Sequence, residues 1–222
     1  ELDKNFQLPD IEYVKKNINS KGLLFICSPN NPTGNIFSLE SIKEIASIFT
    51  GLVVVDEAYI DFSNRKSASS LLDELPYLVV LQTMSKAYGL AGLRLGMAFA
   101  SKEVIRVLNK IKPPYNVNTL SQAEGLKVLK NRTYIMDQIN QIKAERTSLI
   151  KVLEEIEFVI KVYPSEANFL LVEFKDSEKV FTTLRSKGII IRNRTTEIKD
   201  CLRITVGTTE QNNILINAIK EI

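Results

Sequence analysis

Two side chains that could take part in a chemical reaction lie just beyond short apolar runs of this sequence. Asp56 closes the run Leu52–Val55, and Lys86 follows the run Leu78–Leu81 after a few small or polar residues. A lysine amine can form a Schiff base with a carbonyl group, and a carboxylate can raise the pKa of a ring nitrogen beside it. These residue types suit Schiff-base and acid–base chemistry. Taken alone, such a lysine is more often a surface residue and such an aspartate a turn residue. The other motifs of the sequence therefore decide whether these two residues have a chemical role.

Three arginines lie among apolar or glycine neighbours. Arg203 stands between Leu202 and Ile204, Arg192 follows three isoleucines, and Arg94 lies in a glycine- and leucine-rich segment. A charge in apolar surroundings needs an anionic partner, and the arginine fork donates two parallel hydrogen bonds to a phosphate or carboxylate. The arginines indicate anion binding, and the alternative for each is an outward-facing arginine in a surface ion pair.

Composition excludes several other classes of site. The chain has no histidine, which excludes histidine-based triads and histidine-ligated metals, and we expect no metal. Cys27 and Cys201 are far apart, which predicts reduced buried thiols rather than a disulfide or a zinc site. The net charge of +3 is dispersed, and this argues against a nucleic-acid partner. No signal peptide opens the chain and no apolar run could span a membrane, so we expect no membrane partner and a cytoplasmic protein.

The elements that must position these residues alternate between strands and helices. Apolar runs bounded by loop residues predict buried strands, and helical periodicity predicts one helix among them. The expected strands are 23–27, 52–55, 78–81 and 94–100, with the helix at 39–49. Such alternation predicts a mostly parallel sheet, in which ligands bind beyond the carboxyl ends of the strands.

The organisation changes near Pro113-Pro114, and the pattern beyond predicts a second, smaller α/β domain. Residues 119–155 have helical periodicity, with an interruption near Asn131, and further helices are expected at 178–187 and 210–222. Strands are expected at 158–162, 168–174, 189–192 and 201–206. We therefore expect a large domain at residues 1–117 and a small domain at residues 118–222, which includes the long helix.

The motifs form an ordered series along the chain. This series resembles that of the fold-type-I pyridoxal-phosphate aminotransferases. The sequence around each motif is similar to that of the histidinol-phosphate aminotransferases. The series consists of Asn31-Pro32-Thr33-Gly34, Asp56-Glu57-Ala58-Tyr59, Ser85-Lys86, Arg94 and Arg203. The resemblance implies an α/β fold and pyridoxal 5'-phosphate as the cofactor.

The resemblance also implies roles for individual residues of this chain. The residues implied in catalysis are Lys86, Asp56 and Tyr59, with Lys86 holding the cofactor and Asp56 facing its ring nitrogen. The ring hydroxyl would be bound by Asn31 and Tyr59. The cofactor phosphate would be bound by Thr83, Ser85 and Arg94. The substrate's anionic group would be bound by Arg203 and Arg192, with Asn31 also in contact with substrate.

The implied activity is transamination of histidinol phosphate with 2-oxoglutarate and glutamate, in histidine biosynthesis, by a homodimer. The alternatives are an aromatic aminotransferase or a threonine-phosphate decarboxylase, and, from another class, a non-catalytic module derived from such an enzyme. Family members carry a further upstream segment with a phosphate-binding turn and a tyrosine that crosses to the partner subunit. We therefore interpret the chain as a fragment whose large domain is incomplete on its N-terminal side, and we expect exposed apolar residues there.

Overall fold

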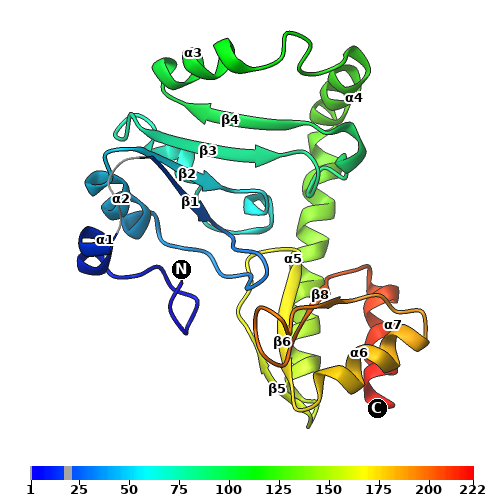
Figure 1. Ribbon diagram of the computed structural model, residues 1–222. Helices are drawn as coiled ribbons and strands as arrows, with labels where there is room; N and C mark the ends of the chain where they lie inside the picture. The colour runs from blue at the N-terminus through cyan, green and yellow to red at the C-terminus, as the bar shows by residue number, and fades with distance from the viewer. Residues whose placement is uncertain (1, 18–21) are drawn as a thin grey trace. The chain divides into compact units, whose positions relative to one another are not determined.

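The chain folds into two compact units, described by a computed structural model for residues 2–17 and 22–222 (Figure 1). Unit 1 comprises Glu1–Pro29 and Ile36–Ile135, and unit 2 comprises Asn30–Asn35 and Met136–Ile222. In the described residues, no helix is both long and apolar enough to cross a membrane.

Unit 1 is built on a four-stranded sheet in the order β1-β2-β3-β4. The strands are β1 (Leu23–Cys27), β2 (Leu52–Asp56), β3 (Leu78–Thr83) and β4 (Gly96–Ala100). The pairs β1–β2 and β2–β3 are parallel, and β4 runs antiparallel to β3. The prediction of a mostly parallel sheet is thereby confirmed.

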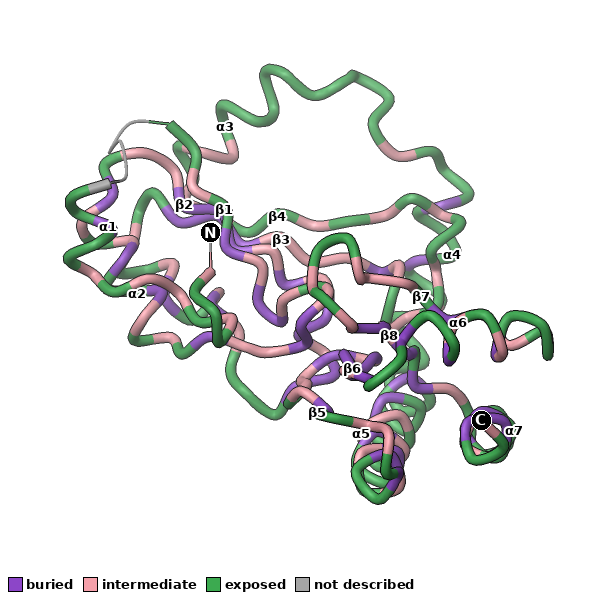
Figure 2. The backbone as a smooth tube through the Cα atoms, turned by 60° about the horizontal axis from the view of Figure 1, so that its bottom comes forward, coloured by how far each residue is buried: buried purple, intermediate pink, exposed green. Residues whose placement is uncertain are grey.

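Helices α1 (Ile11–Asn17) and α2 (Leu39–Ile48) cover one face of this sheet. Val14 of α1 and Ile42 of α2 pack against Val53 and Val55 of β2 in one apolar cluster. Figure 2 shows the buried positions of unit 1 gathered along β2 and β3. Ser38 begins α2 by accepting a hydrogen bond from the backbone N–H of Ser41, which satisfies one of the free donors at the helix start.

The remaining elements of unit 1 are short 3₁₀ turns and helices. They are η1 (Ile60–Phe62), η2 (Ala68–Leu71), η3 (Ala91–Leu93), α3 (Lys102–Ile111), α4 (Thr119–Lys130) and the start of α5 (Arg132–Glu154). Helix α3 buries none of its residues, and the edge strand β1 leaves Leu23 and Phe25 exposed at 62% and 63%. The expected exposed apolar residues are therefore present.

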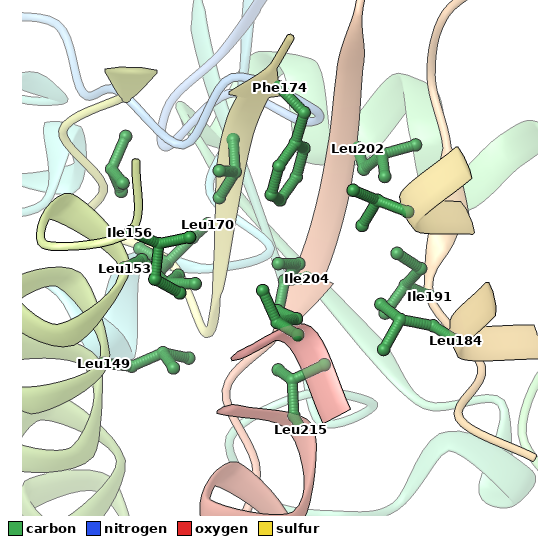
Figure 3. Packing of buried hydrophobic residues seen from close by; sticks show 14 of the residues in the cluster. Leu149, Leu153, Ile156, Leu170, Phe174, Leu184, Ile191, Leu202, Ile204 and Leu215 are labelled. Carbon is green, nitrogen blue, oxygen red and sulfur yellow. The ribbon is translucent and has the colours of Figure 1, made fainter. Parts of the chain in front are cut away.

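Unit 2 contains a second four-stranded sheet, entirely antiparallel, in the order β5-β6-β8-β7. Its strands are β5 (Val159–Val162), β6 (Phe169–Phe174), β7 (Arg192–Asn193) and β8 (Cys201–Thr205), and its later helices are α6 (Ser177–Ser186) and α7 (Thr209–Lys220). Figure 3 shows the core, where side chains of α5, α6 and α7 meet those of the two central strands. The labelled members include Leu149, Leu153, Leu170, Phe174, Leu184, Leu202, Ile204 and Leu215.

Several expected boundaries need correction. The strand expected at 94–100 begins only at Gly96, because Arg94 has a left-handed backbone with φ of 55°. The strand expected at 189–192 is reduced to Arg192–Asn193. Helices α1 and α3 were not predicted, whereas the interruption near Asn131 is confirmed as the C-cap of α4.

The boundary between the two units lies inside α5, between Ile135 and Met136. The sequence predicted this boundary between residues 117 and 118. Helix α4 stays with unit 1 because it packs on the segment before β4. The hydroxyl of Ser121 donates to the carbonyl of Leu93 at 3.0 Å. A Cβ on Gly125 would lie 2.8 Å from Cδ2 of Leu95, so α4 approaches this segment closely at the glycine.

Candidate functional site

In unit 1, chemically capable side chains gather where the parallel strands β2 and β3 end. Asp56, the last residue of β2, pairs in register with Leu81 of β3, so both strands deliver their carboxyl ends to one edge. The half-buried Asp56 accepts a hydrogen bond at Oδ1 from the backbone N–H of Ala58, at 3.0 Å. This bond fixes the direction of its carboxylate.

Lys86 lies in a tight loop immediately after β3. Its carbonyl accepts from the N–H of Gly89 at 3.1 Å, and the N–H of Leu90 closes the loop on the carbonyl of Met84 at 3.0 Å. The exposed Lys86 places its Nζ 5.4 Å from the ring centroid of Tyr59, whose side chain is buried. The structure thus brings together the predicted lysine and tyrosine.

Hydroxyl and guanidinium donors lie in the same loop region. The hydroxyl of Thr83 donates to Ser85 Oγ at 2.9 Å and accepts from the Ser85 N–H at 3.1 Å. Thr83 also pairs with Gly96 at the start of β4, two residues after Arg94. The exposed Arg94 donates from Nη1 to the Ala91 carbonyl at 3.0 Å.

The donor set of unit 1 has the composition that pyridoxal phosphate requires. It offers one amine, one carboxylate, two adjacent hydroxyls, a guanidinium and a buried phenol ring, all at neighbouring strand ends. A phosphate is matched by the hydroxyls and the guanidinium, and a protonated ring nitrogen by the carboxylate. We name Asp56, Tyr59, Thr83, Ser85, Lys86 and Arg94 the strand-end group.

In unit 2, two arginines stand directly opposite each other. Arg192 of β7 pairs with Arg203 of β8 in the antiparallel register, which puts both side chains on one face of the sheet. Like charges at directly opposed positions destabilise a sheet, unless an anion lies between or beside them. We name Arg192 and Arg203 the arginine pair.

The predicted Asn31 also belongs to unit 2 and contacts this pair. Arg203 donates from Nη1 to Asn31 Oδ1 at 2.7 Å, and its guanidinium carbon lies 5.0 Å from the ring centroid of Phe169. The asparagine and the ring hold the guanidinium in one orientation. The structure therefore brings together Asn31 and Arg203, with Arg192 on the adjacent strand.

The loop that carries Asn31 is fixed by internal and external hydrogen bonds. The side-chain amide of Asn30 donates to Thr33 Oγ1 at 2.7 Å, and the N–H of Gly34 donates to the Asn30 carbonyl at 2.7 Å. The carbonyl of Gly34 accepts from the N–H of Glu166 at 2.8 Å. Gly34 has φ of 81°, and a Cβ there would lie 2.6 Å from Ser165 Oγ, so only glycine fits.

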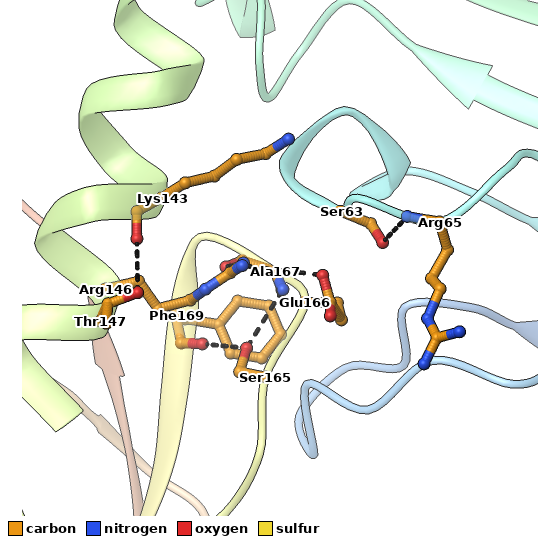
Figure 4. Close-up of polar contacts among 9 residues, drawn as sticks. All are labelled: Ser63, Arg65, Lys143, Arg146, Thr147, Ser165, Glu166, Ala167 and Phe169. Atoms are coloured by element: carbon orange, nitrogen blue, oxygen red, sulfur yellow. Dashed lines mark hydrogen bonds and ion pairs between the residues drawn. The ribbon is translucent and has the colours of Figure 1, made fainter.

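A buried arginine supports the segment that receives this loop (Figure 4). Arg146 of α5 donates from Nη1 to the carbonyl of Ala167 at 2.7 Å, and its Nη2 lies 3.7 Å from Glu166 Oε2. Burial lowers the pKa of Arg146, and the charge of Glu166 opposes that shift. Ser165 donates its hydroxyl to the Phe169 carbonyl at 2.6 Å. These contacts fix residues 165–167, on which the Asn31 loop rests.

Glu57 is a residue to which the sequence assigned no role. Its side chain is 3% exposed, and its carboxylate accepts hydrogen bonds from three donors of two neighbouring segments. Glu57 directly follows the last residue of β2, and its N–H continues the pairing with β3 by donating to the Leu81 carbonyl. No local pattern marks this carboxylate as buried, because β2 buries the consecutive residues Val53, Val54 and Val55 rather than alternate ones.

Comparisons with known proteins agree with this geometry. Residues 2–219 match the family described as aminotransferase class I and II. A histidinol-phosphate aminotransferase of Flavobacterium johnsoniae is 52% identical over 99% of this chain, and one of Christiangramia forsetii is 51% identical over all of it. The crystal structure of the histidinol-phosphate aminotransferase from Clostridium acetobutylicum superimposes with a TM-score of 0.91 at 25% identity, over 99% of this chain and 69% of that one.

This chain spans 63% and 64% of the lengths of the two curated relatives, somewhat less than two thirds. The match nevertheless runs through every motif of the strand-end group and the arginine pair, because it covers nearly all of the residues present. The chain belongs to the aminotransferase class I and II family.

Proposed function

We propose that the protein carrying this chain is a pyridoxal-phosphate-dependent aminotransferase that converts histidinol phosphate, with 2-oxoglutarate and glutamate as the second substrate pair, in histidine biosynthesis. The observation that carries the proposal is the position of the Lys86 amine over the Tyr59 ring, beside the strand end that bears Asp56. The names of relatives about 50% identical to this chain support the choice of substrate.

Each residue of the strand-end group has a defined task in this proposal. When bound, pyridoxal phosphate would supply a reactive carbonyl, which accepts and returns the amino group, and a ring that draws electrons from the substrate. Lys86 Nζ binds the cofactor and, once released, moves the proton at the substrate's amino-bearing carbon. Asp56 keeps the ring nitrogen protonated. Thr83, Ser85 and Arg94 donate to the cofactor phosphate.

The arginine pair gives the proposal its substrate preference. Two guanidinium groups on one sheet face can bind a doubly charged phosphate with parallel hydrogen bonds, and Asn31 holds one of them in place. A phosphate-bearing amine such as histidinol phosphate satisfies both arginines. Asn31 and Tyr59 are the proposed partners of the cofactor's ring hydroxyl. The proposal also includes a cytoplasmic homodimer, which rests on the resemblance of the motifs alone.

The test uses the complete natural protein, reconstituted with pyridoxal phosphate. The expected result is a visible absorption band that Lys86→Ala abolishes and that a control substitution of another exposed lysine, Lys220→Ala, leaves intact. Glutamate should form from 2-oxoglutarate when histidinol phosphate is supplied. A band without this transamination, but with release of carbon dioxide from phosphothreonine, would replace the proposal with a decarboxylase. Absence of any Lys86-dependent band would overturn the cofactor assignment itself.

A further inference from the structure

We propose that Glu57 is a positioning residue, which locks the strand end bearing Asp56 to the segment bearing Lys86 and thereby sets how the cofactor is held. The inference rests on the proposed function, since it concerns the same cofactor site. It assigns a task to a carboxylate that never reaches substrate, because its side chain is only 3% exposed.

The carboxylate of Glu57 is buried and fully engaged. It accepts from the Ser67 hydroxyl at 2.6 Å, from the Ala68 backbone N–H at 2.6 Å and from the Gln82 side-chain amide at 2.9 Å. A buried charge is costly unless several donors compensate it, and hydrogen bonds to a charged group are stronger than neutral ones. This constellation is therefore a strong local constraint rather than a chance surface contact.

The three donors belong to the segments that frame the strand-end group. Gln82 is the residue of β3 directly before Thr83 and lies four residues before Lys86 in the chain. Ser67 caps η2, accepting a hydrogen bond from the Ser69 N–H, and Ala68 begins that turn. Glu57 itself extends the β2–β3 pairing through its N–H, which donates to the Leu81 carbonyl at 2.8 Å.

Asp56 and Glu57 are consecutive, so their side chains leave the backbone on opposite sides. With Glu57 anchored inward, Asp56 is turned outward, where the Ala58 N–H holds its carboxylate. Release of the Glu57 anchor would let the end of β2 rotate against β3. The Asp56 carboxylate would then lose its fixed relation to the Lys86 amine.

The geometry provides a conservative substitution and a rescue. Glu57→Gln keeps the shape but replaces one acceptor with an amide donor, which then faces a donor from Ser67, Ala68 or Gln82. The double exchange Glu57→Gln with Gln82→Glu restores a matched set: Gln at 57 can accept from Ala68 and donate to Glu at 82, which can accept from Ser67. Ser67→Ala removes one donor and leaves the charge in place. Glu74→Gln, in a surface ion pair with Lys43, is the matched control.

The experiment measures two properties of the complete natural protein besides activity: the dissociation constant of pyridoxal phosphate, and the pH midpoint of the Lys86-dependent visible band. For Glu57→Gln we expect roughly tenfold weaker cofactor binding, as for loss of one charge-assisted hydrogen bond, together with a displaced pH midpoint. Ser67→Ala should change both properties in the same direction by less. The double exchange should restore both, and Glu74→Gln should change neither.

The outcomes separate this inference from the proposed function. A wild-type band with unchanged cofactor affinity and pH midpoint in Glu57→Gln would overturn the positioning role alone, even if the melting temperature fell. If Glu57→Gln fails to fold, Ser67→Ala and the double exchange decide: wild-type values for Ser67→Ala, or weak cofactor binding by a well-folded double exchange, would contradict the role. Absence of a Lys86-dependent band in the wild type would contradict both the proposed function and the positioning role of Glu57.

Discussion

Opposed arginines on neighbouring strands are unusual because each raises the electrostatic cost of the other, so the pair Arg192 and Arg203 points to a bound anion. Their environments differ in a way that separates their tasks. Arg203 is half-buried, stacked on Phe169 and bonded to Asn31, whereas Arg192 is exposed. A pre-oriented guanidinium loses less freedom on binding than a mobile one, so Arg203 should contribute more.

Substitution of the two arginines by glutamine should therefore have unequal effects. For Arg203→Gln we expect kcat/KM for histidinol phosphate to fall roughly 100-fold, equivalent to about 3 kcal/mol of lost charge-assisted hydrogen bonding. Arg192→Gln should reduce it less. Steady-state kinetics with histidinol phosphate measure both variants. Equal effects, or a larger effect of Arg192→Gln, would contradict the assignment.

The backbone conformation of Gly34 leads to a prediction about stability. Gly34→Ala combines a disfavoured φ of 81° with a 2.6 Å approach to Ser165 Oγ, and should lower the free energy of unfolding by about 1–3 kcal/mol. Adding Ser165→Gly removes the contacts with the serine side chain but not the backbone strain, and it also removes the Ser165 hydrogen bonds to the Phe169 carbonyl and the Ala167 N–H, so the double variant should recover at most part of the loss relative to Gly34→Ala. Urea unfolding followed by circular dichroism measures this. Ser165→Gly alone is the control, and a double variant as stable as this control would mean that the backbone conformation at position 34 costs nothing.

Cys201 should be chemically inert in the folded chain. Burial, followed by the charge of Glu173, raises the pKa of its thiol from 9.0 to about 12. At pH 8, iodoacetamide should modify the half-buried Cys27 first and leave Cys201 intact, as peptide mass spectrometry would show. Because the folded pKa is the higher one, the neutral thiol stabilises the fold below pH 9, and this stabilisation should be lost as the pH rises towards 12. Modification of Cys201 at pH 8 without unfolding would contradict this.

At the scale of elements, helix α7 begins with a reciprocal pair of hydrogen bonds. Thr208 accepts from the Gln211 N–H, and the Gln211 side chain accepts from the Thr208 N–H. Loss of such a capping box leaves two backbone donors of the first turn without partners. The start of α7 follows the strand that carries Arg203 after three residues.

Thr208→Ala should lower the free energy of unfolding by about 1 kcal/mol, the usual cost of losing an N-cap. Thr182→Ala is the control, because that hydroxyl donates to the Glu178 carbonyl inside α6, where alanine is at least as favourable. Chemical denaturation of both variants gives the comparison. A loss for Thr182→Ala as large as that for Thr208→Ala would indicate that the cap has no special value.

The elements also show how far a single sequence can be interpreted. Strands β1, β2 and β3 and the interruption at Asn131 were predictable, because uninterrupted apolar runs and turn residues carry strong local signals. Arg94 was misplaced into a strand because nothing in its neighbours encodes a left-handed backbone. Helix α3 was missed although the helical spacing of its apolar residues could have predicted it. The residue types of the site were predictable, whereas the Asn31–Arg203 bond and the Glu57 donors depend on tertiary contacts.

At the scale of the whole molecule, unit 1 exposes apolar side chains that a stable folded surface normally covers. Leu23 and Phe25 lie on the edge strand β1, where unpaired backbone groups can recruit another chain. A chain of residues 1–222 should therefore self-associate with rising concentration. Phe25→Lys should reduce light scattering, and Tyr13→Lys, at an exposed aromatic of α1 outside the edge strand, should reduce it less. Concentration-independent monomers for the unaltered chain would contradict this.

The membership of Asn30–Asn35 in unit 2 has a consequence for biosynthesis. The contact between Asn31 and Arg203 spans 172 positions of the chain, and residues 165–166 meet the same loop. During synthesis from the N-terminus, the loop leaves the ribosome long before any of its partners exist. The parallel strands of unit 1 can pair early, but the Asn31 loop cannot meet Arg203 until β8 has been translated. A ribosome stalled before β8 would thus hold a nascent chain in which Asn31, Lys86 and Arg192 are already present and Arg203 is not.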